Sequence, residues 1–293
     1  MDVDAEQMSQ GSPLDLLKQW AAAGVANAFT SALLNPFDVA KTRMQLVASR
    51  PSLITTLRGM YSQGGVVRGL FLPGLSASMV REMLSSGPRA GFYVPVRTTL
   101  LSVGLGDETA RISAALVTGT LGSVIANPVD VVKIRQMRDP HTYGSLHAGL
   151  FAVLRDEGVG GLYKGLAPST LRAAFIAVGE LATYDIAKQR LRAVIYAPGE
   201  QEGVALHVTA SLVTGVVASF VAAPFDLIKA RAMSAVGSTE SIASVVRALA
   251  REGGFPLSLL RGVVPAYMRL GPHALICFPI FEQLRALLSL DYL

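Results

Sequence analysis

The sequence predicts an all-α membrane protein with six transmembrane helices in three repeats around a pseudo-threefold axis. Three observations predict this class: the composition is 51% hydrophobic and only 16% charged, charge-free runs recur, and one motif is present three times. Soluble proteins usually carry roughly 25% charged residues, so the composition points to lipid as the solvent. We expect the repeats at residues 1–104, 105–200 and 201–293, forming one integral domain.

The first, third and fifth spans are predicted from charge-free runs. Residues 19–37, 112–129 and 203–225 contain no Asp, Glu, Lys or Arg, and each is close to the ~20 residues that a helix needs to cross a bilayer. Each run ends in the same motif: a proline, an acid at +2, a base at +5 and a base at +7. Such self-similarity indicates a repeat architecture, with one helix pair in each unit.

The second, fourth and sixth spans are predicted from the weaker hydrophobic stretches 74–101, 166–195 and 262–290. Each carries an arginine 44 or 45 residues after the proline of its repeat. A charge in mid-membrane is costly unless it faces a water-filled interior, so we expect these helices to line a cavity. The three arginines should lie at one depth; they are Arg81, Arg172 and Arg269.

Polar, amphipathic stretches separate the paired spans. Residues 51–63, 143–157 and 238–252 are too short and too charged to cross a bilayer. We therefore expect short helices that lie on the membrane surface.

The tripled motif predicts a ring of ion pairs. A proline inside a helix removes a hydrogen bond and kinks the helix, so kinks at Pro36, Pro128 and Pro224 would draw three helix ends together. Each acid could then pair with the base of a neighbouring repeat; the alternative is surface pairing within single helices. Half-buried ion pairs add little stability, so a ring that breaks and reforms is better explained as a gate. Its members are Asp38, Lys41, Asp130, Lys133, Asp226 and Lys229.

A second ring is predicted thirteen and sixteen residues beyond the arginines. Repeats two and three keep an acid and a base there, whereas repeat one has Val94 in place of the acid and should close less firmly. The alternative is a set of solvated charges at helix ends. The charged positions are Arg97, Asp185, Lys188, Glu282 and Arg285.

The three arginines predict an anion site. Guanidinium groups around one cavity repel one another unless an anion joins them, and they bind carboxylate or phosphate in a bidentate manner. A solute with two carboxylates would satisfy this site, with Arg89 and Glu180 adjusting the charge balance. Alternatively each arginine snorkels or pairs with a nearby acid, as Arg81 could with Glu82. Glu180 is either a partner of Arg172 or a protonatable group that couples H⁺ to anion movement.

Two further basic positions predict contact with lipid. Lys164-Gly165 and Arg261-Gly262 follow surface stretches and begin the fourth and sixth spans. A helix N-terminus with a nearby base is a phosphate site, so we expect a lipid headgroup there. Repeat one has Leu72-Pro73-Gly74 at this place and lacks the base.

The composition also argues against several classes of protein. The single cysteine, Cys277, excludes a disulfide scaffold, and four scattered histidines argue against a zinc enzyme. The net charge of +5 is too thinly spread for a nucleic-acid partner. The chain shows no nucleophile, metal cluster or phosphate loop, so we expect no enzyme, no metal and no cofactor. The acidic N-terminus resembles neither a secretory signal nor a transit peptide, so any organelle address is expected inside the chain.

The tripled Pro-x-Asp-x-x-Lys-x-Arg pattern resembles the mitochondrial carrier family, from roughly residue 15 to residue 290. Glu157-Gly158 with Tyr163-Lys164-Gly165 is similar to the family's acid-Gly, aromatic-base-Gly element. Repeat one has Gln63-Gly64 and repeat three has Glu252-Gly253, both with altered spacing to the following glycine. The resemblance implies a monomer with both termini on the cytosolic side, surface helices on the matrix side, and alternating access to a central site.

The resemblance also implies roles for the charged rings. The Pro-motif residues become the matrix gate, with Gln45 bracing one pair and the three arginines as substrate contacts. The implied pairs are Asp38–Lys133, Asp130–Lys229 and Asp226–Lys41 in the matrix gate, and Asp185–Arg285 and Glu282–Arg97 in the cytosolic gate, where Lys188 loses its partner to Val94.

Within the family, the arginines are most similar to the dicarboxylate, oxoglutarate and uncoupling-protein branch, although Ala173, Pro88 and Pro95 depart from it. We expect a mitochondrial inner-membrane carrier that exchanges di- or oxodicarboxylates against another anion, with cardiolipin as lipid partner. One alternative is an uncoupling-like proton and fatty-acid carrier; another is a carrier-shaped adaptor that no longer transports. Peroxisomes and plastids are alternative locations.

Overall fold

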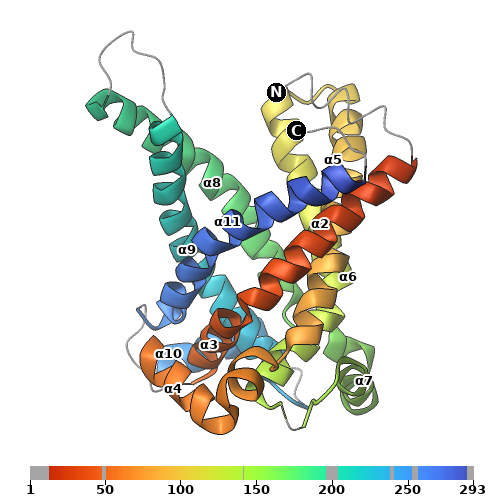
Figure 1. Ribbon diagram of the computed structural model, residues 1–293, viewed down its shortest axis with the longest axis vertical. Coiled ribbons are helices and arrows are strands. Elements are labelled where there is room, and N and C mark those ends of the chain that lie inside the picture. The colour runs from red at the N-terminus through yellow and green to blue at the C-terminus, as the bar shows by residue number, and fades with distance from the viewer. Residues whose placement is uncertain are drawn as a thin grey trace.

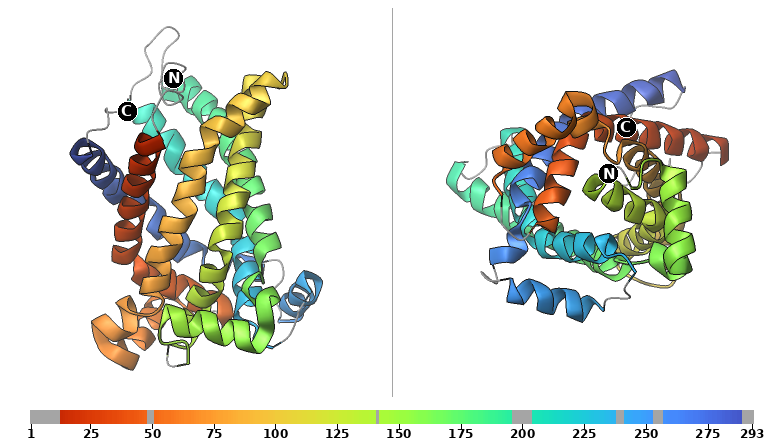
Figure 2. Two further views of the ribbon diagram at one scale, coloured as in Figure 1. Left: turned by 90° about the vertical axis from the view of Figure 1, so that its right-hand side faces the viewer. Right: turned by 90° about the horizontal axis from the view of Figure 1, so that it is seen from below.

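The computed structural model describes residues 13–47, 51–140, 142–195, 204–237, 241–252 and 257–288. Within these ranges every regular element is a helix, so the predicted all-α class is confirmed (Figure 1). The start of α2 and the end of α11 lie at one end of the bundle, and the short helices α4, α7 and α10 lie at the other end (Figures 1 and 2).

The motif-bearing helices are α2 (Pro13–Leu33) with α3 (Asn35–Leu46), α6 (Asp107–Arg138) and α9 (Val204–Ser234). At Pro36 the helix is interrupted rather than kinked as expected. Helix α2 ends at Leu33, Leu34 forms a turn, and α3 begins at Asn35 with the proline in its first turn. The Phe37 amide donates to the Leu34 carbonyl at 3.0 Å, a tightened i to i−3 bond. Pro128 and Pro224 instead lie inside continuous helices.

The arginine-bearing helices are α5 (Leu75–Ser102), α8 (Leu166–Ile195) and α11 (Val263–Leu287). The residue before each helix is a glycine with positive φ, at +68°, +73° and +83°. These glycines also permit close packing on the next repeat. A Cβ atom would lie 3.0 Å from Met137 Cγ at Gly74, 2.8 Å from Met233 Cγ at Gly165 and 3.1 Å from Gln45 Cγ at Gly262. The contacts run from repeat one to two, two to three and three to one, which closes the threefold arrangement.

The surface helices are α4 (Leu53–Gly64), α7 (Leu146–Leu162) and α10 (Ile242–Arg251). Each begins after a serine whose side chain accepts a backbone hydrogen bond, at Ser52, Ser145 and Ser241. This is the N-cap arrangement that stabilises helix starts. Two irregular segments lead to the following helices, the π-helix η1 (Gly65–Phe71) and the 3₁₀-helix η2 (Leu257–Leu260).

Two stretches of the described helices are long and apolar enough to cross a membrane, Asp107–Arg138 and Val213–Ser234. Large apolar side chains are exposed on each motif-bearing helix and are absent from the cavity lining: Phe29 is 51% exposed, Leu121 42% and Phe220 48%. Buried apolar clusters instead form where the surface helices pack on α3, α6 and α9. The core thus lies at the surface-helix end, and apolar groups cover the outer wall.

Candidate functional site

A cavity of about 660 Å³ lies inside the bundle. Its base includes Asp130 and Asp226, and it extends to Glu108 and Arg111 in the first turns of α6. Because α6 begins at the end of the bundle where α2 begins and α11 ends, the cavity reaches toward that end (Figure 1). Arg81, Arg172 and Arg269 all line it, as the sequence predicted for arginines at equivalent positions.

Three lysine–aspartate pairs form a ring at the base of the cavity. Lys133 Nζ lies 3.0 Å from Asp38 Oδ2, Lys229 Nζ 2.7 Å from Asp130 Oδ2, and Lys41 Nζ 2.7 Å from Asp226 Oδ2. Each pair joins two different repeats, and these are the partners that the resemblance implied. In the part of the chain that the structure describes, the pairs therefore lie between helices rather than within single helices.

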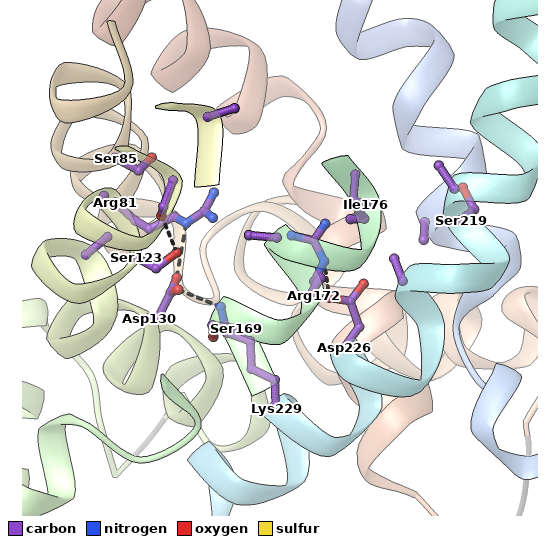
Figure 3. A pocket seen from close by; sticks show the side chains of 18 of the residues that line it. Arg81, Ser85, Ser123, Asp130, Ser169, Arg172, Ile176, Ser219, Asp226 and Lys229 are labelled. Atoms are coloured by element: carbon purple, nitrogen blue, oxygen red, sulfur yellow. Dashed lines mark hydrogen bonds and ion pairs between the residues drawn. The ribbon is translucent and has the colours of Figure 1, made fainter. Parts of the chain in front are cut away.

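The three arginines bind the same aspartates. Arg81 Nε lies 3.1 Å from Asp130 Oδ1 and Arg172 Nε 2.8 Å from Asp226 Oδ1 (Figure 3). Arg269 Nη1 lies 3.2 Å from Asp38 Oδ2. Every ring aspartate therefore holds one lysine and one arginine.

The three arginines thus hold protein carboxylates in this structure, and their role as substrate contacts stays a prediction. The alternative of pairing with a protein acid is present, since Arg81 Nη1 lies 2.6 Å from Glu82 Oε1. However, the partner common to all three arginines is the aspartate of a Pro motif. The cavity arginines and the lysine–aspartate ring therefore form one network.

A second layer of arginines, which the sequence reasoning left without a role, closes the same circle below the ring. The +7 base of each motif donates from Nε to a backbone carbonyl of the next repeat: Arg43 to Met137 at 3.1 Å, Arg135 to Met233 at 3.0 Å and Arg231 to Gln45 at 2.9 Å. The recurrence of a base at +7 was the available signal. The sequence could not predict the carbonyl that accepts the bond, because every residue has a backbone carbonyl.

The same arginines also attach the surface helices. Arg135 donates two hydrogen bonds to Glu157, at 2.6 and 3.0 Å, and Lys164 Nζ lies 2.6 Å from the same carboxylate. In repeat three, Arg231 and Arg261 lie 2.9 and 2.6 Å from Glu252. The charges of Lys164 and Arg261, expected at lipid headgroups, are thus already matched by carboxylates, and the lipid site stays a prediction.

Burial and hydrogen bonding oppose each other at these glutamates. Burial alone would raise the pKa of Glu157, but hydrogen bonds from Arg135 and Lys164 outweigh it and lower the pKa to about 2. Burial also raises the pKa of Glu252, and the guanidinium groups of Arg261 and Arg231 reverse the shift to a net lowering. Both carboxylates are therefore charged at neutral pH.

The asparagine before each of the first two prolines is a further site residue that the sequence reasoning missed. Asn35 donates from Nδ2 to the carbonyls of Phe71 and Pro73, at 2.6 and 3.1 Å. Asn127 does the same to Leu162 and Lys164, at 2.8 and 3.2 Å. Repeat three has Ala223 at this position. The Asn-Pro dipeptide was the signal for this tie between the motif helix and the start of the next helix.

The expected brace at Gln45 differs in the structure. Its Nε2 donates to the Arg261 carbonyl at 3.5 Å, and no hydrogen bond of the described residues joins it to the Lys41–Asp226 pair. Gln45 therefore contacts the turn before α11. The ring pair lies one helical turn away from it.

The second predicted ring is only partly described. Arg97 Nη2 lies 2.6 Å from Asp107 Oδ1 at the start of α6, and the Arg285 guanidinium lies 5.6 Å from the centre of the Phe281 ring. Side chains outside the described part of the structure include four predicted site residues, which are Arg89, Glu180, Asp185 and Lys188. The cytosolic gate stays a prediction.

Comparison with known proteins gives one family. Its sequence model, described as "Mitochondrial carrier protein", matches residues 12–103, 108–194 and 200–292. A mitochondrial citrate transporter of Aspergillus niger is 31% identical over 91% of this chain and 88% of its own length. Mitochondrial uncoupling protein 1 of Arabidopsis thaliana is 32% identical, with coverage of 93% and 94%. A mitochondrial dicarboxylate transporter of Saccharomyces cerevisiae is 29% identical, covering 91% of each chain.

Proposed function

The chain belongs to the mitochondrial carrier family, and we propose that it exchanges small anions, dicarboxylates or oxodicarboxylates, across the mitochondrial inner membrane by alternating access. The observation that carries this proposal is the shared use of the ring aspartates. Arg81, Arg172 and Arg269 line the cavity, and each is paired with an aspartate that also holds a ring lysine.

This sharing couples binding to the gate. An anion that enters the cavity competes with an aspartate for the guanidinium of its arginine, because both are carboxylates. When Arg172 turns to the anion, Asp226 loses one of its two cations and its bond to Lys41 is left less supported. The anion opens the ring only if it binds the open or occluded state more tightly than the closed state, since equal affinity shifts nothing.

Location and partners belong to the same proposal. The location is the inner membrane, which relatives named as mitochondrial transporters support. We place the termini and the mouth of the cavity on the cytosolic side. We assign the protein as a multi-pass monomer. Its anionic lipid partner is cardiolipin, at the helix starts after Gly165 and Gly262.

Reconstitution into liposomes tests the function. We expect saturable counter-exchange of a dicarboxylate, reduced about ten- to hundredfold in Arg172→Ala, because a hydrogen bond to a charged group contributes about 1.5–3 kcal/mol. Arg155→Ala is the matched control. Arg155 lies on α7, its side chain is 68% exposed, and its partner is the adjacent Asp156.

The other outcomes decide between the alternatives. Proton flux with fatty acid and without anion exchange would support the uncoupling-like carrier. Neither flux nor exchange, from protein that is folded and correctly inserted, would support the adaptor. Equal loss in Arg155→Ala and Arg172→Ala would contradict the role given to the cavity arginine.

A further inference from the structure

The cavity is not symmetric, and a single carboxylate makes the difference. Glu82 follows Arg81 directly on α5, whereas Ala173 and Leu270 follow the equivalent arginines. The Glu82 residue is only 8% exposed and lines the cavity. A buried charge requires a partner, and its partner is the Arg81 guanidinium at 2.6 Å.

Arg81 consequently binds two carboxylates of the protein. Its Nη1 contacts Glu82, and its Nε contacts Asp130 at 3.1 Å. Among the described residues, the ion pair of Arg172 is with Asp226 and that of Arg269 is with Asp38, while the Glu82 charge acts on Arg269 only from a longer distance. The guanidinium of Arg81 is therefore the most fully occupied of the three, and an anion would have to displace two carboxylates to bind it.

Two further cavity positions of repeat one also differ from their equivalents in the other repeats. Asn27 lines the cavity where repeats two and three have Gly119 and Gly215. Ser85, one helical turn after Arg81, lies where repeat two has Ile176. Repeat one thus contributes polar side chains at these two positions, and Glu82 balances the charge of Arg81.

Glu82 also lowers the net positive charge of the site. Six bases, three lysines and three arginines, meet four carboxylates in the ring and beside it. Two positive charges stay unmatched, and without Glu82 there would be three. Arg89 and Glu180, whose side chains lie outside the described part, carry opposite charges.

We propose that Glu82 is a specificity-determining residue. It holds Arg81 away from substrate, leaves Arg172 and Arg269 as a two-armed anion site, and thereby matches the carrier to dianions rather than trianions. This inference rests on the proposed function, since it requires that the cavity binds anions.

Thermal stabilisation of the full chain in detergent measures the affinities, because a ligand that binds only the folded form raises the melting temperature. The probes are succinate, a dianion at neutral pH, and tricarballylate, a trianion. Glu82→Gln keeps the shape and removes the charge. We expect the affinity for tricarballylate to rise about tenfold relative to that for succinate, equivalent to about 1.4 kcal/mol.

Glu108→Gln is the matched control, because Glu108 lines the same cavity near the start of α6. It removes the same charge without changing a described contact of the three arginines, so the ratio of the two affinities should stay constant. A converse variant, Ala173→Glu, places a carboxylate beside Arg172 as Glu82 lies beside Arg81. We expect it to lower the succinate affinity about tenfold, equivalent to about 1.4 kcal/mol.

The outcomes separate this inference from the proposed function. An unchanged ratio in Glu82→Gln, or the same change in Glu108→Gln, overturns the role of Glu82 while leaving an anion carrier. If Glu82→Gln does not fold, Ala173→Glu decides, and an unchanged succinate affinity overturns the inference. A wild-type protein that neither binds nor exchanges either anion overturns the proposed function as well.

Discussion

Repeats one and two attach their surface helices at the same position but with different chemistry. In repeat two, Arg135 makes two hydrogen bonds to Glu157, which also pairs with Lys164. In repeat one, Arg43 donates one hydrogen bond, at 2.6 Å, to the neutral side chain of Gln63. Both arginines nevertheless donate from Nε to the next repeat.

Burial makes the difference between the two attachments larger. The side chains of Arg135 and Glu157 are only 2% and 4% exposed, whereas Gln63 lies at the surface. Hydrogen bonds between charged groups are about twice as strong as neutral ones, and buried charges depend on their partners. Closing the ring of repeats and attaching the surface helix are therefore separate structural roles of these arginines. Repeat one performs the first as fully as repeat two and the second more weakly.

The backbone differs at the same place. The surface helix bends at a glycine with φ of +66° in repeat one and +68° in repeat two, at Gly65 and Gly158. The glycine immediately before the next span follows nine positions later in repeat one, at Gly74, and seven positions later in repeat two, at Gly165. The wider i to i+5 bonding of the π-helix η1 accommodates the additional residues.

The largest effect is expected from Glu157→Gln, which gives repeat two the chemistry of repeat one. Arg135 and Lys164 would stay buried without a carboxylate, so the free energy of unfolding should fall by about 3–5 kcal/mol. Denaturant or thermal unfolding in detergent measures the change. Gln63→Ala, the matched change in repeat one, should cost about 1 kcal/mol. Equal losses at the two positions would contradict the comparison.

Of these two attachments, the one in repeat two should make stability depend on pH. Hydrogen bonds lower the pKa of Glu157 from 4.5 to about 2, so its contribution is complete above the unfolded value and is lost as the pH falls between the two. We expect level stability from neutral pH to about 5, and a fall below 4.5. Glu157→Gln should lack this part of the fall. The same slope in both proteins would place the titration elsewhere.

The two bend glycines should respond alike, because their backbone requirement is the same. A Cβ at Gly65 or Gly158 would meet nothing within 4 Å, so alanine costs only the backbone strain. Both glycines combine positive φ with extended ψ, −161° and −167°, a region essentially restricted to glycine, so we expect a cost of about 1–3 kcal/mol at each. Gly160→Ala is the control in open space within the helix and should stabilise by about 0.5–1 kcal/mol. Thermal unfolding compares the three. A loss at Gly158 alone would show that the repeats differ in backbone as well as in charge.

The smallest effect is expected from Gln63→Glu, which gives repeat one the acid of repeat two. The new carboxylate would pair with Arg43 at an exposed site, so the gain should be about 0.2–1 kcal/mol. It should decrease at high salt, which screens exposed charges. Ser62→Glu adds the same charge one residue away and serves as the control. A gain as large as the loss in Glu157→Gln would mean that burial does not decide the strength of this pair.

The sequence by itself determined the repeat structure and the character of each helix. Charge-free runs, mid-span arginines and amphipathic surface stretches are local properties, and each follows from which side of a helix meets lipid, water or protein. The lysine–aspartate partners of the ring came from the family resemblance, because the spacing of Pro36, Pro128 and Pro224 shows only that the motif recurs.

The tertiary structure alone decided which groups touch. Arg81 meets Asp130, and Arg269 meets Asp38 across 231 positions of sequence. Such contacts depend on the depth and crossing of helices from different repeats, which residue spacing within one helix does not encode. The same holds for Arg135 and the Met233 carbonyl, since a backbone acceptor has no residue type. The sequence therefore identified the charged residues, and only the packing of the three repeats determined which of these groups are in contact.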